Sequence, residues 1–299
     1  MDSLRSFLKK ASPVSGSDNK ESALTDHLSQ NGATVFYGQK ASNIIDGIDL
    51  VVYTAAIHED NEEFAEAKRQ NLPMLSRAEL LGQLMTNYKT PVAISGTHGK
   101  TTHNLYAFLI LLFAADLDPT ISVGGILKAI EGNIRVGGPD LFITEACEYT
   151  NSFLHFFPKI GIILNVDADH LDFFKDLDDI RNSFHLFAKL LPENGTLVIN
   201  GDIDKIEEIT SDLSCRVITF GKEASLDYSA ANITYNEQGN ASFDVVKNGQ
   251  NVAHLALAVG GEHNVYNALA AIAVADILGV PGGDDPDRSC FLPRNRPPF

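Results

Sequence analysis

The fold is decided by the stretch Val92-Ala93-Ile94-Ser95-Gly96-Thr97-His98-Gly99-Lys100-Thr101-Thr102. Its first four residues favour a short buried strand, and a helical stretch follows from about residue 100 to 115. Two glycines let the backbone approach an anion closely, and the loop N–H groups, the helix dipole and Lys100 all attract phosphate oxygens. The stretch therefore predicts a strand, a phosphate-binding loop and a helix. It is a shorter variant of the usual loop, because Ile94 stands where a glycine is common. The alternative is an ordinary glycine turn with an exposed lysine.

Composition excludes several classes of protein. The chain has 299 residues, of which 44% are hydrophobic, and its formal net charge is −16. Such an acidic chain is not expected to bind nucleic acid, which requires basic surface. The longest apolar run, Leu105 to Ala115, is too short to span a membrane, which takes about 20 residues. The chain begins without the pattern of a signal peptide, and its three cysteines favour neither disulfides nor a metal site, so we expect a cytoplasmic protein.

The chain divides into two α/β units and a tail. We expect residues 1–88 to form a partial Rossmann-like domain, 89–280 a central mostly parallel α/β ATPase domain, and 281–299 an irregular tail. A helix is expected at residues 3–10. Strands are expected at 34–37, 50–53, 92–95, 141–144, 160–166, 196–199 and 217–220, and further helices at 60–70, 77–85 and 177–191.

An antiparallel appendage is predicted between Tyr228 and Val259. Three β-rich stretches are joined there by residues 236–240 and by Asn248-Gly249, and the second connection is a strong hairpin signal. An alanine-rich helix is expected to follow from His263 to Leu278.

Two more polar side chains follow predicted strands. Glu145 ends the strand at 141–144, and His170 follows the strand at 160–166. Ligands of open parallel sheets collect at the carboxyl ends of strands, so Lys100, Glu145 and His170 are expected to meet in one crevice. Carboxylate oxygen suits Mg²⁺, whereas imidazole suits softer metals such as Mn²⁺ or Zn²⁺. Capping or surface ion pairing is the alternative for each residue taken alone.

Other polar residues lie near these candidates. Asp167, Asp169 and Asp172 surround His170, and one of them could orient its imidazole or all could be solvated. Asn264 and Asn267 share one face of the last helix and could bind a nucleobase edge, or Asn264 could cap the helix.

Four blocks together resemble the Mur ligases, ATP-dependent amide-forming enzymes of bacterial peptidoglycan precursor synthesis. These blocks are Gly96 to Thr102, Glu145 to Leu154, Asn165 to Asp172, and Gly261 to Ala268. The second block, with Ser15-Gly16-Ser17-Asp18, is most similar to the members that join L-alanine to UDP-N-acetylmuramate.

The resemblance implies a site and a mechanism. ATP would phosphorylate the substrate carboxylate, and the amine would attack the resulting acyl phosphate. Lys100, with Gly96, Thr97, His98, Gly99 and Thr102, would hold the phosphates. Thr101 and Glu145 would bind Mg²⁺, His170 with Glu145 would bind a second metal ion, Mg²⁺ or Mn²⁺, and Asn264 and Asn267 would face adenine.

The chain also departs from the family pattern. It starts beyond the glycine turn that helps to hold UDP, and it lacks the expected C-terminal ligase domain, so we expect a chain truncated at both ends with impaired activity. Residues 103–113 and 281–299 also differ from the family, which a shifted reading frame would explain. The alternatives are an inert ATP-binding fragment and another ligase of Mur-like or folylpolyglutamate type. A monomer or weak dimer fits the sequence equally well.

Overall fold

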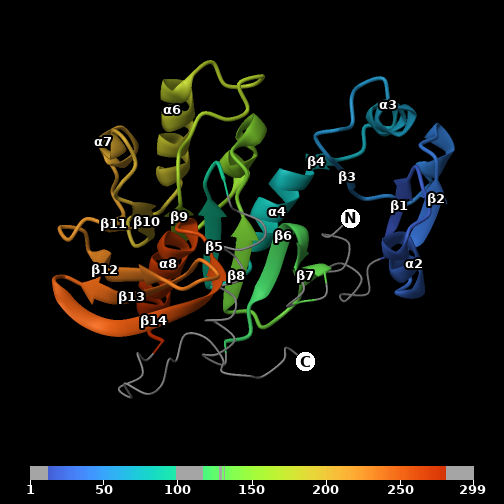
Figure 1. The fold of residues 1–299 in the computed structure, drawn as a ribbon. Helices are drawn as coiled ribbons and strands as arrows, with labels where there is room; N and C mark the ends of the chain where they lie inside the picture. Colours follow the sequence, from blue (N-terminus) through green and yellow to red (C-terminus); the bar gives the residue numbers. More distant parts are fainter. Residues whose placement is uncertain (1–12, 99–116, 128–129, 131, 281–299) are drawn as a thin grey trace. The chain divides into compact units, whose positions relative to one another are not determined.

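A computed structural model describes residues 13–98, 117–127, 130 and 132–280 of the chain. The helices expected at 3–10 and 100–115 and the tail at 281–299 lie outside these residues. The chain separates into two compact units, Met1–Leu84 and Met85–Phe299, each with its own sheet structure (Figure 1). No helix of the described residues is long and apolar enough to cross a membrane.

The first unit contains two small parallel sheets. Strand β1 (Ser15–Asp18) pairs with β2 (Thr34–Tyr37), and β3 (Val51–Tyr53) pairs with β4 (Met74–Ser76). Its helical elements are α2 (Ala23–Gln30), the 3-10 turn η1 (Ala41–Asn43) and α3 (Glu62–Arg69). Helix α4 (Arg77–Met85) spans the boundary between the two units. The Ser22 and Thr25 side chains form a capping box at the start of α2, which explains why the helix begins there.

The second unit is built on one ten-stranded sheet. Its spatial order is β14-β13-β12-β11-β10-β9-β5-β8-β6-β7. The strands that run parallel are β5 (Thr90–Ser95), β6 (Thr120–Leu127), β8 (Leu141–Glu145), β9 (Ile160–Ile163), β10 (Thr196–Asn200) and β11 (Arg216–Gly221). All residues of β9 and β10 are buried, as expected for parallel strands covered on both faces. At the edge, β7 (Gly132–Arg135) pairs antiparallel with β6.

The predicted antiparallel appendage continues the main sheet. It consists of β12 (Tyr228–Tyr235), β13 (Asn240–Lys247) and β14 (Gln250–Gly260), and β12 joins the sheet by a short parallel pairing with β11. The turn between β13 and β14 has positive φ at both Asn248 and Gly249, the conformation that the Asn-Gly pair predicts.

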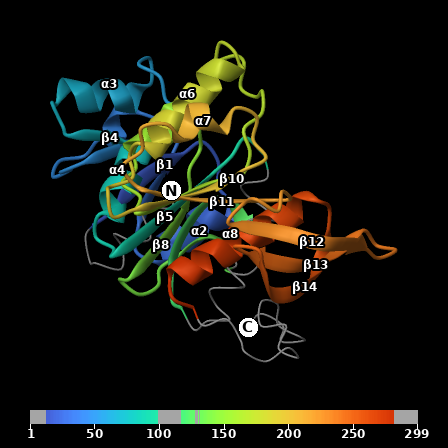
Figure 2. The ribbon, with the colours of Figure 1, turned by 90° about the vertical axis from the view of Figure 1, so that its left-hand side faces the viewer.

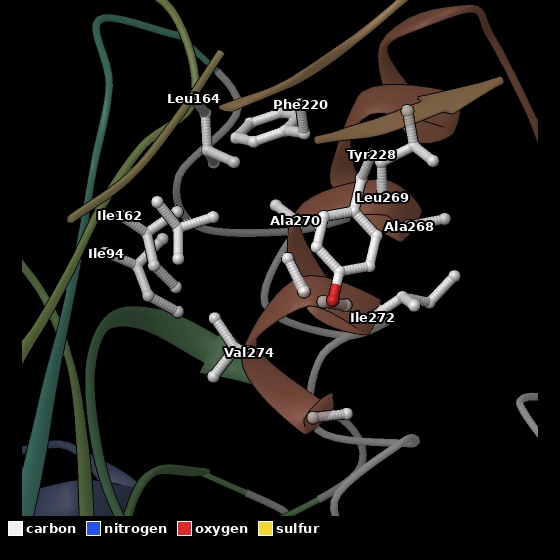
Figure 3. Packing of buried hydrophobic residues seen from close by; sticks show 14 of the residues in the cluster. Ile94, Ile162, Leu164, Phe220, Tyr228, Ala268, Leu269, Ala270, Ile272 and Val274 are labelled. Atoms are coloured by element: carbon white, nitrogen blue, oxygen red, sulfur yellow. The ribbon is translucent and has the colours of Figure 1, made fainter. Parts of the chain in front are cut away.

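Helix α8 (His263–Ile277) supplies much of the core of this unit. It contacts strands β10 to β14 and lies beside the antiparallel strands in Figure 2. Figure 3 shows Leu269, Ile272 and Val274 of this helix in the cluster of buried residues that also includes Ile94 and Phe220 of the sheet. The helix thus packs on β10 to β14, and its buried residues share one core cluster with Ile94 of β5.

A second helical group contains α6 (Leu177–Ala188), α7 (Ile206–Thr210) and the 3-10 segment η4 (Tyr149–His155). Phe153 of η4 is fully buried and stacks on Phe187 of α6, with ring centroids 4.8 Å apart. Burying one such side chain contributes about 2 to 3 kcal/mol. This contact fixes the segment that follows Glu145.

Candidate functional site at the ends of three neighbouring strands

The predicted phosphate loop and two metal-ligand candidates follow three adjacent parallel strands. Strand β5 leads into the loop and lies between β8 and β9, with Ile94 opposite Glu145 and Ser95 opposite Ile163. Glu145 ends β8, and the chain after β9 carries His170. The three segments therefore leave the same edge of the sheet, as expected for a ligand site in a parallel sheet.

The described part of the loop is bound to the segment after β9. The His98 N–H donates to Asn165 Oδ1 at 2.7 Å, and the Asn165 side-chain amide donates to the His98 carbonyl at 3.0 Å. Thr97 donates its N–H to the Asn165 carbonyl at 3.2 Å, and its hydroxyl accepts the Asp167 N–H at 3.0 Å. These hydrogen bonds hold the described part of the loop, at Thr97 and His98, against the segment after β9.

Gly96 allows this close approach. Its φ of +153° lies in a region that L side chains rarely adopt. A Cβ atom at this position would lie 3.2 Å from both the Asn165 backbone nitrogen and the Leu164 Cβ. Larger residues would push the loop away from the end of β9.

Glu145 is half-buried, and one carboxylate oxygen has a backbone partner. The Gly124 N–H donates to Glu145 Oε2 at 2.8 Å. A Cβ atom on residue 124 would come within 3.0 Å of the same oxygen. The glycine therefore gives the carboxylate both a donor and the space to meet it.

His170 faces two carboxylates. Its Nε2 lies 3.7 Å from Glu148 Oε1 and 4.0 Å from Asp169 Oδ2, and the Glu148 side chain is 1% exposed. The His170 backbone has φ of +50°, a left-handed conformation that is uncommon outside glycine. Asp169 also accepts the His170 N–H at 2.7 Å and lies 3.8 Å from His98 Nδ1.

The remaining acidic residues of this cluster have separate partners. Asp172 accepts a hydrogen bond from the Tyr149 hydroxyl at 2.9 Å, and this bond raises the pKa of Tyr149 above its usual value. Asp167 contacts Thr97 through its backbone. Of the three predicted acids, Asp169 is the one within 4.0 Å of the imidazole.

Asn264 and Asn267 lie on one face of α8 and are 2% and 4% exposed. The Asn267 amide donates to Asn264 Oδ1 at 3.2 Å, and Asn264 donates to the Gly260 carbonyl at 2.7 Å. Asn264 does not cap the helix, because the residue at the cap is Glu262. Nearby on the same helix, Tyr266 donates to Asp202, and burial with this bond raises the Tyr266 pKa.

Four predicted phosphate-site residues, Gly99, Lys100, Thr101 and Thr102, lie outside the described residues. In the part of the chain that the structure describes, no group of three His, Cys, Asp or Glu side chains could hold a metal ion. A site for Mg²⁺ needs fewer than three such side chains, since this ion keeps several waters and binds one or two carboxylates together with phosphate oxygens. The carboxylate of Glu145 fits such a site, whereas the imidazole of His170 suits a softer ion such as Mn²⁺.

Sequence reasoning missed several contributors to this site. Gly124, Glu148, Tyr149 and Asn165 all contact a predicted site residue or the loop. Asn165 lies inside the strand expected at 160–166, whereas the observed strand β9 ends at Ile163, so the sequence did not mark it as a strand-end residue. The others become neighbours of the site only through tertiary contacts.

Comparison with known proteins gives consistent matches. The Mur ligase middle domain matches residues 94–275, and the catalytic domain of the Mur ligase family matches residues 4–89. A UDP-N-acetylmuramate--L-alanine ligase of Lachnospira eligens is 58% identical over 275 residues, covering 92% of this chain and 60% of the relative. The enzyme of the same name from Agathobacter rectalis is 55% identical over 267 residues, covering 89% of this chain and 58% of the relative.

Solved structures extend the likeness to the fold. The UDP-N-acetylmuramate-alanine ligase of Thermotoga maritima has a TM-score of 0.77 and 29% identity, covering 97% of this chain and 63% of that one. The UDP-N-acetylmuramate:L-alanyl-gamma-D-glutamyl-meso-diaminopimelate ligase from Neisseria meningitides has a TM-score of 0.82 and 25% identity. The match covers 94% of this chain and 90% of that one. The chain spans three fifths of the length of the Lachnospira eligens relative.

Proposed function

This chain belongs to the Mur ligase family, and on that premise we propose that it serves the ATP-dependent joining of L-alanine to UDP-N-acetylmuramate. The reaction is an amide-forming step of peptidoglycan precursor synthesis. The observation that carries the proposal is the 58% identity to a ligase named for these two substrates. The neighbouring ends of β5, β8 and β9, which the predicted phosphate loop, Glu145 and the segment of His170 follow, support it. A cytoplasmic location is part of the proposal.

The two predicted domains divide the binding tasks. We assign residues 1–88 to the UDP-bearing substrate and residues 89–280 to ATP. In the second unit, the loop from Gly96 to Thr102 receives the phosphates, with Lys100 as its positive charge. Asn264 and Asn267 are assigned to the adenine by the resemblance to the family, and a mutual hydrogen bond fixes their two amides relative to each other.

The chemistry requires charge neutralisation. A substrate carboxylate attacks the terminal phosphorus of ATP, ADP leaves, and the amine of L-alanine then displaces phosphate from the acyl phosphate. Both partners of the first step are anionic, so the barrier depends on positioning and on local positive charge. Mg²⁺ or Mn²⁺, held by Thr101, Glu145 and His170, would supply part of that charge. Gly124 and Asn165 keep Glu145 and the loop in place for it.

Phosphate release measured with ATP, UDP-N-acetylmuramate and L-alanine tests the proposal. We expect release that depends on both acceptor substrates. Stabilisation of the chain by ATP without turnover would instead show an ATP-binding chain that is catalytically inert. Release with L-alanyl-γ-D-glutamyl-meso-diaminopimelate but not with L-alanine would assign the acceptor of the Neisseria meningitides ligase, and would contradict the choice of L-alanine.

A further inference from the structure

The His170 ring contacts Tyr149, an aromatic side chain to which the proposed function assigns no role. The ring centroids of Tyr149 and His170 are 4.5 Å apart and their planes differ by 34°. The two side chains come from different segments, after β8 and after β9. A tyrosine that lies on one face of an imidazole restricts the rotation of that ring.

Tyr149 is itself held at two further points. Its hydroxyl donates to Asp172 Oδ2 at 2.9 Å, and its ring meets Phe173 edge-on with centroids 6.0 Å apart. Asp172 and Phe173 belong to the same loop as His170, whose carbonyl accepts the N–H of Phe173 at 2.9 Å. The tyrosine therefore contacts this loop at Asp172 and Phe173 as well as through its tilted ring contact with His170.

The segment that carries Tyr149 is also fixed by its contacts with helix α6. Thr150 and Asn151 have φ of +54° and +55°, and a left-handed β-branched residue persists only where the surrounding structure imposes it. The Asn151 side chain accepts a hydrogen bond from Ser183 of α6 at 2.5 Å. Two residues later, Phe153 is fully buried. Tyr149 thus projects from a rigid turn anchored on α6.

The orientation that results places His170 Nε2 toward carboxylates. It lies 3.7 Å from the buried Glu148, the residue directly before Tyr149. The same segment therefore supplies both the ring that packs on the imidazole and the carboxylate that faces its Nε2. A metal ligand needs its ring direction fixed by neighbours, and their loss typically costs at least about tenfold in metal affinity.

We propose that Tyr149 is a positioning residue that holds the imidazole of His170 in the orientation required to bind the divalent metal of the ligase site. The inference rests on the proposed function, since that function makes His170 a metal ligand. The contribution comes from the aromatic ring, which its contact with Phe173 holds in place without the hydroxyl. Phenylalanine should therefore replace Tyr149 well, and leucine should not.

The test measures Mn²⁺ binding by electron paramagnetic resonance in the presence of ADP, and the NMR shifts of the His170 ring protons without metal. Tyr149→Leu should weaken Mn²⁺ binding about tenfold and shift the His170 ring protons, because the ring current of Tyr149 is lost. Tyr149→Phe should remain within about twofold of the wild type. The matched control, Phe157→Leu, removes an aromatic ring that is 56% exposed and should change neither quantity.

The double variant separates positioning from general loosening of the fold. In a His170→Ala background, Tyr149→Leu should cause no further loss of Mn²⁺ affinity, because it acts through His170. An additional loss there would overturn the inference, as would wild-type Mn²⁺ affinity in Tyr149→Leu while His170→Ala binds more weakly. Wild-type affinity in His170→Ala would instead contradict the metal role of His170 in the proposed function.

Discussion

Asn165 and His98 are joined by two reciprocal hydrogen bonds, one in each direction between the Asn165 side chain and the His98 backbone. The pair connects the phosphate loop after β5 to the segment after β9. It fixes the backbone at His98 before any ligand arrives, and a segment that is already fixed does not have to be ordered on binding.

Removing this pair should weaken nucleotide binding. Each of the two hydrogen bonds contributes about 0.5 to 1.5 kcal/mol. Asn165→Ala is therefore expected to lower the affinity for ADP with Mg²⁺ about tenfold by isothermal titration calorimetry. The matched control is Asn236→Ala in a hairpin. It removes the side-chain oxygen that accepts two hydrogen bonds, from the N–H groups of Gln238 and Asn240. Equal affinity in the wild type and Asn165→Ala would show that the pair has no influence on the loop.

A methyl group at residue 124 should displace the Glu145 carboxylate. The added Cβ would stand 3.0 Å from Glu145 Oε2, so the side chain must move by a few tenths of an ångström. We expect Gly124→Ala to weaken Mn²⁺ binding in the presence of ADP by about fivefold, which corresponds to about 1 kcal/mol. Gly138→Ala is the control, because its Cβ would meet its nearest neighbour at an ordinary 3.5 Å. The same loss in both variants would exclude a specific effect on Glu145.

Stability at low pH should depend on Asp276. Burial opposes ionisation of this carboxylate, but hydrogen bonds from Lys247 and Tyr228 outweigh burial and lower its pKa below the usual 3.8. The unfolded chain therefore binds the proton more tightly. The resulting stabilisation is complete above about pH 4 and is lost as the pH falls through the folded pKa.

Urea unfolding of the wild type and Asp276→Asn between pH 2 and pH 7 measures this contribution. We expect the wild type to be more stable by less than about 1 kcal/mol at neutral pH, since half of the side chain is exposed, and the difference to shrink below about pH 4. Tyr228→Phe keeps the ring in the core but removes one donor, so it should reduce the same pH dependence in part. A difference that stays constant with pH would rule out this linkage.

The sequence predicted the parallel part of the fold well. The strand at 34–37 and the helix at 77–85 have the predicted bounds, because the apolar pattern marks both. The strand at 34–37 is not buried as expected, since its two end residues are exposed and its two middle residues only half-buried. Strands β6 and β7 were missed, since one contains Gly124-Gly125 and the other has only four residues. Strand β1, Ser15–Asp18, has almost no strand propensity and exists through its parallel pairing with β2.

The site was predictable only where it follows local rules. Polar residues at the ends of apolar strands, such as Glu145, can be identified as site candidates from their position in the sequence. The contacts of Tyr149 with His170 depend on left-handed backbone at Thr150, Asn151 and His170, which no local preference of threonine or histidine predicts. The register between β5, β8 and β9 decides which strand ends meet, and this information is tertiary.

The most direct test of the central claim, that the loop from Gly96 to Thr102 binds the phosphates of ATP, is a calorimetric titration with a non-hydrolysable ATP analogue and Mg²⁺. We predict one site per wild-type chain and at least about tenfold weaker binding by Lys100→Ala, since a charge-assisted hydrogen bond contributes about 1.5 to 3 kcal/mol. Lys89→Ala removes an exposed lysine that pairs with Asp140 and should bind as the wild type does. Equal affinity of Lys100→Ala and the wild type would contradict the account.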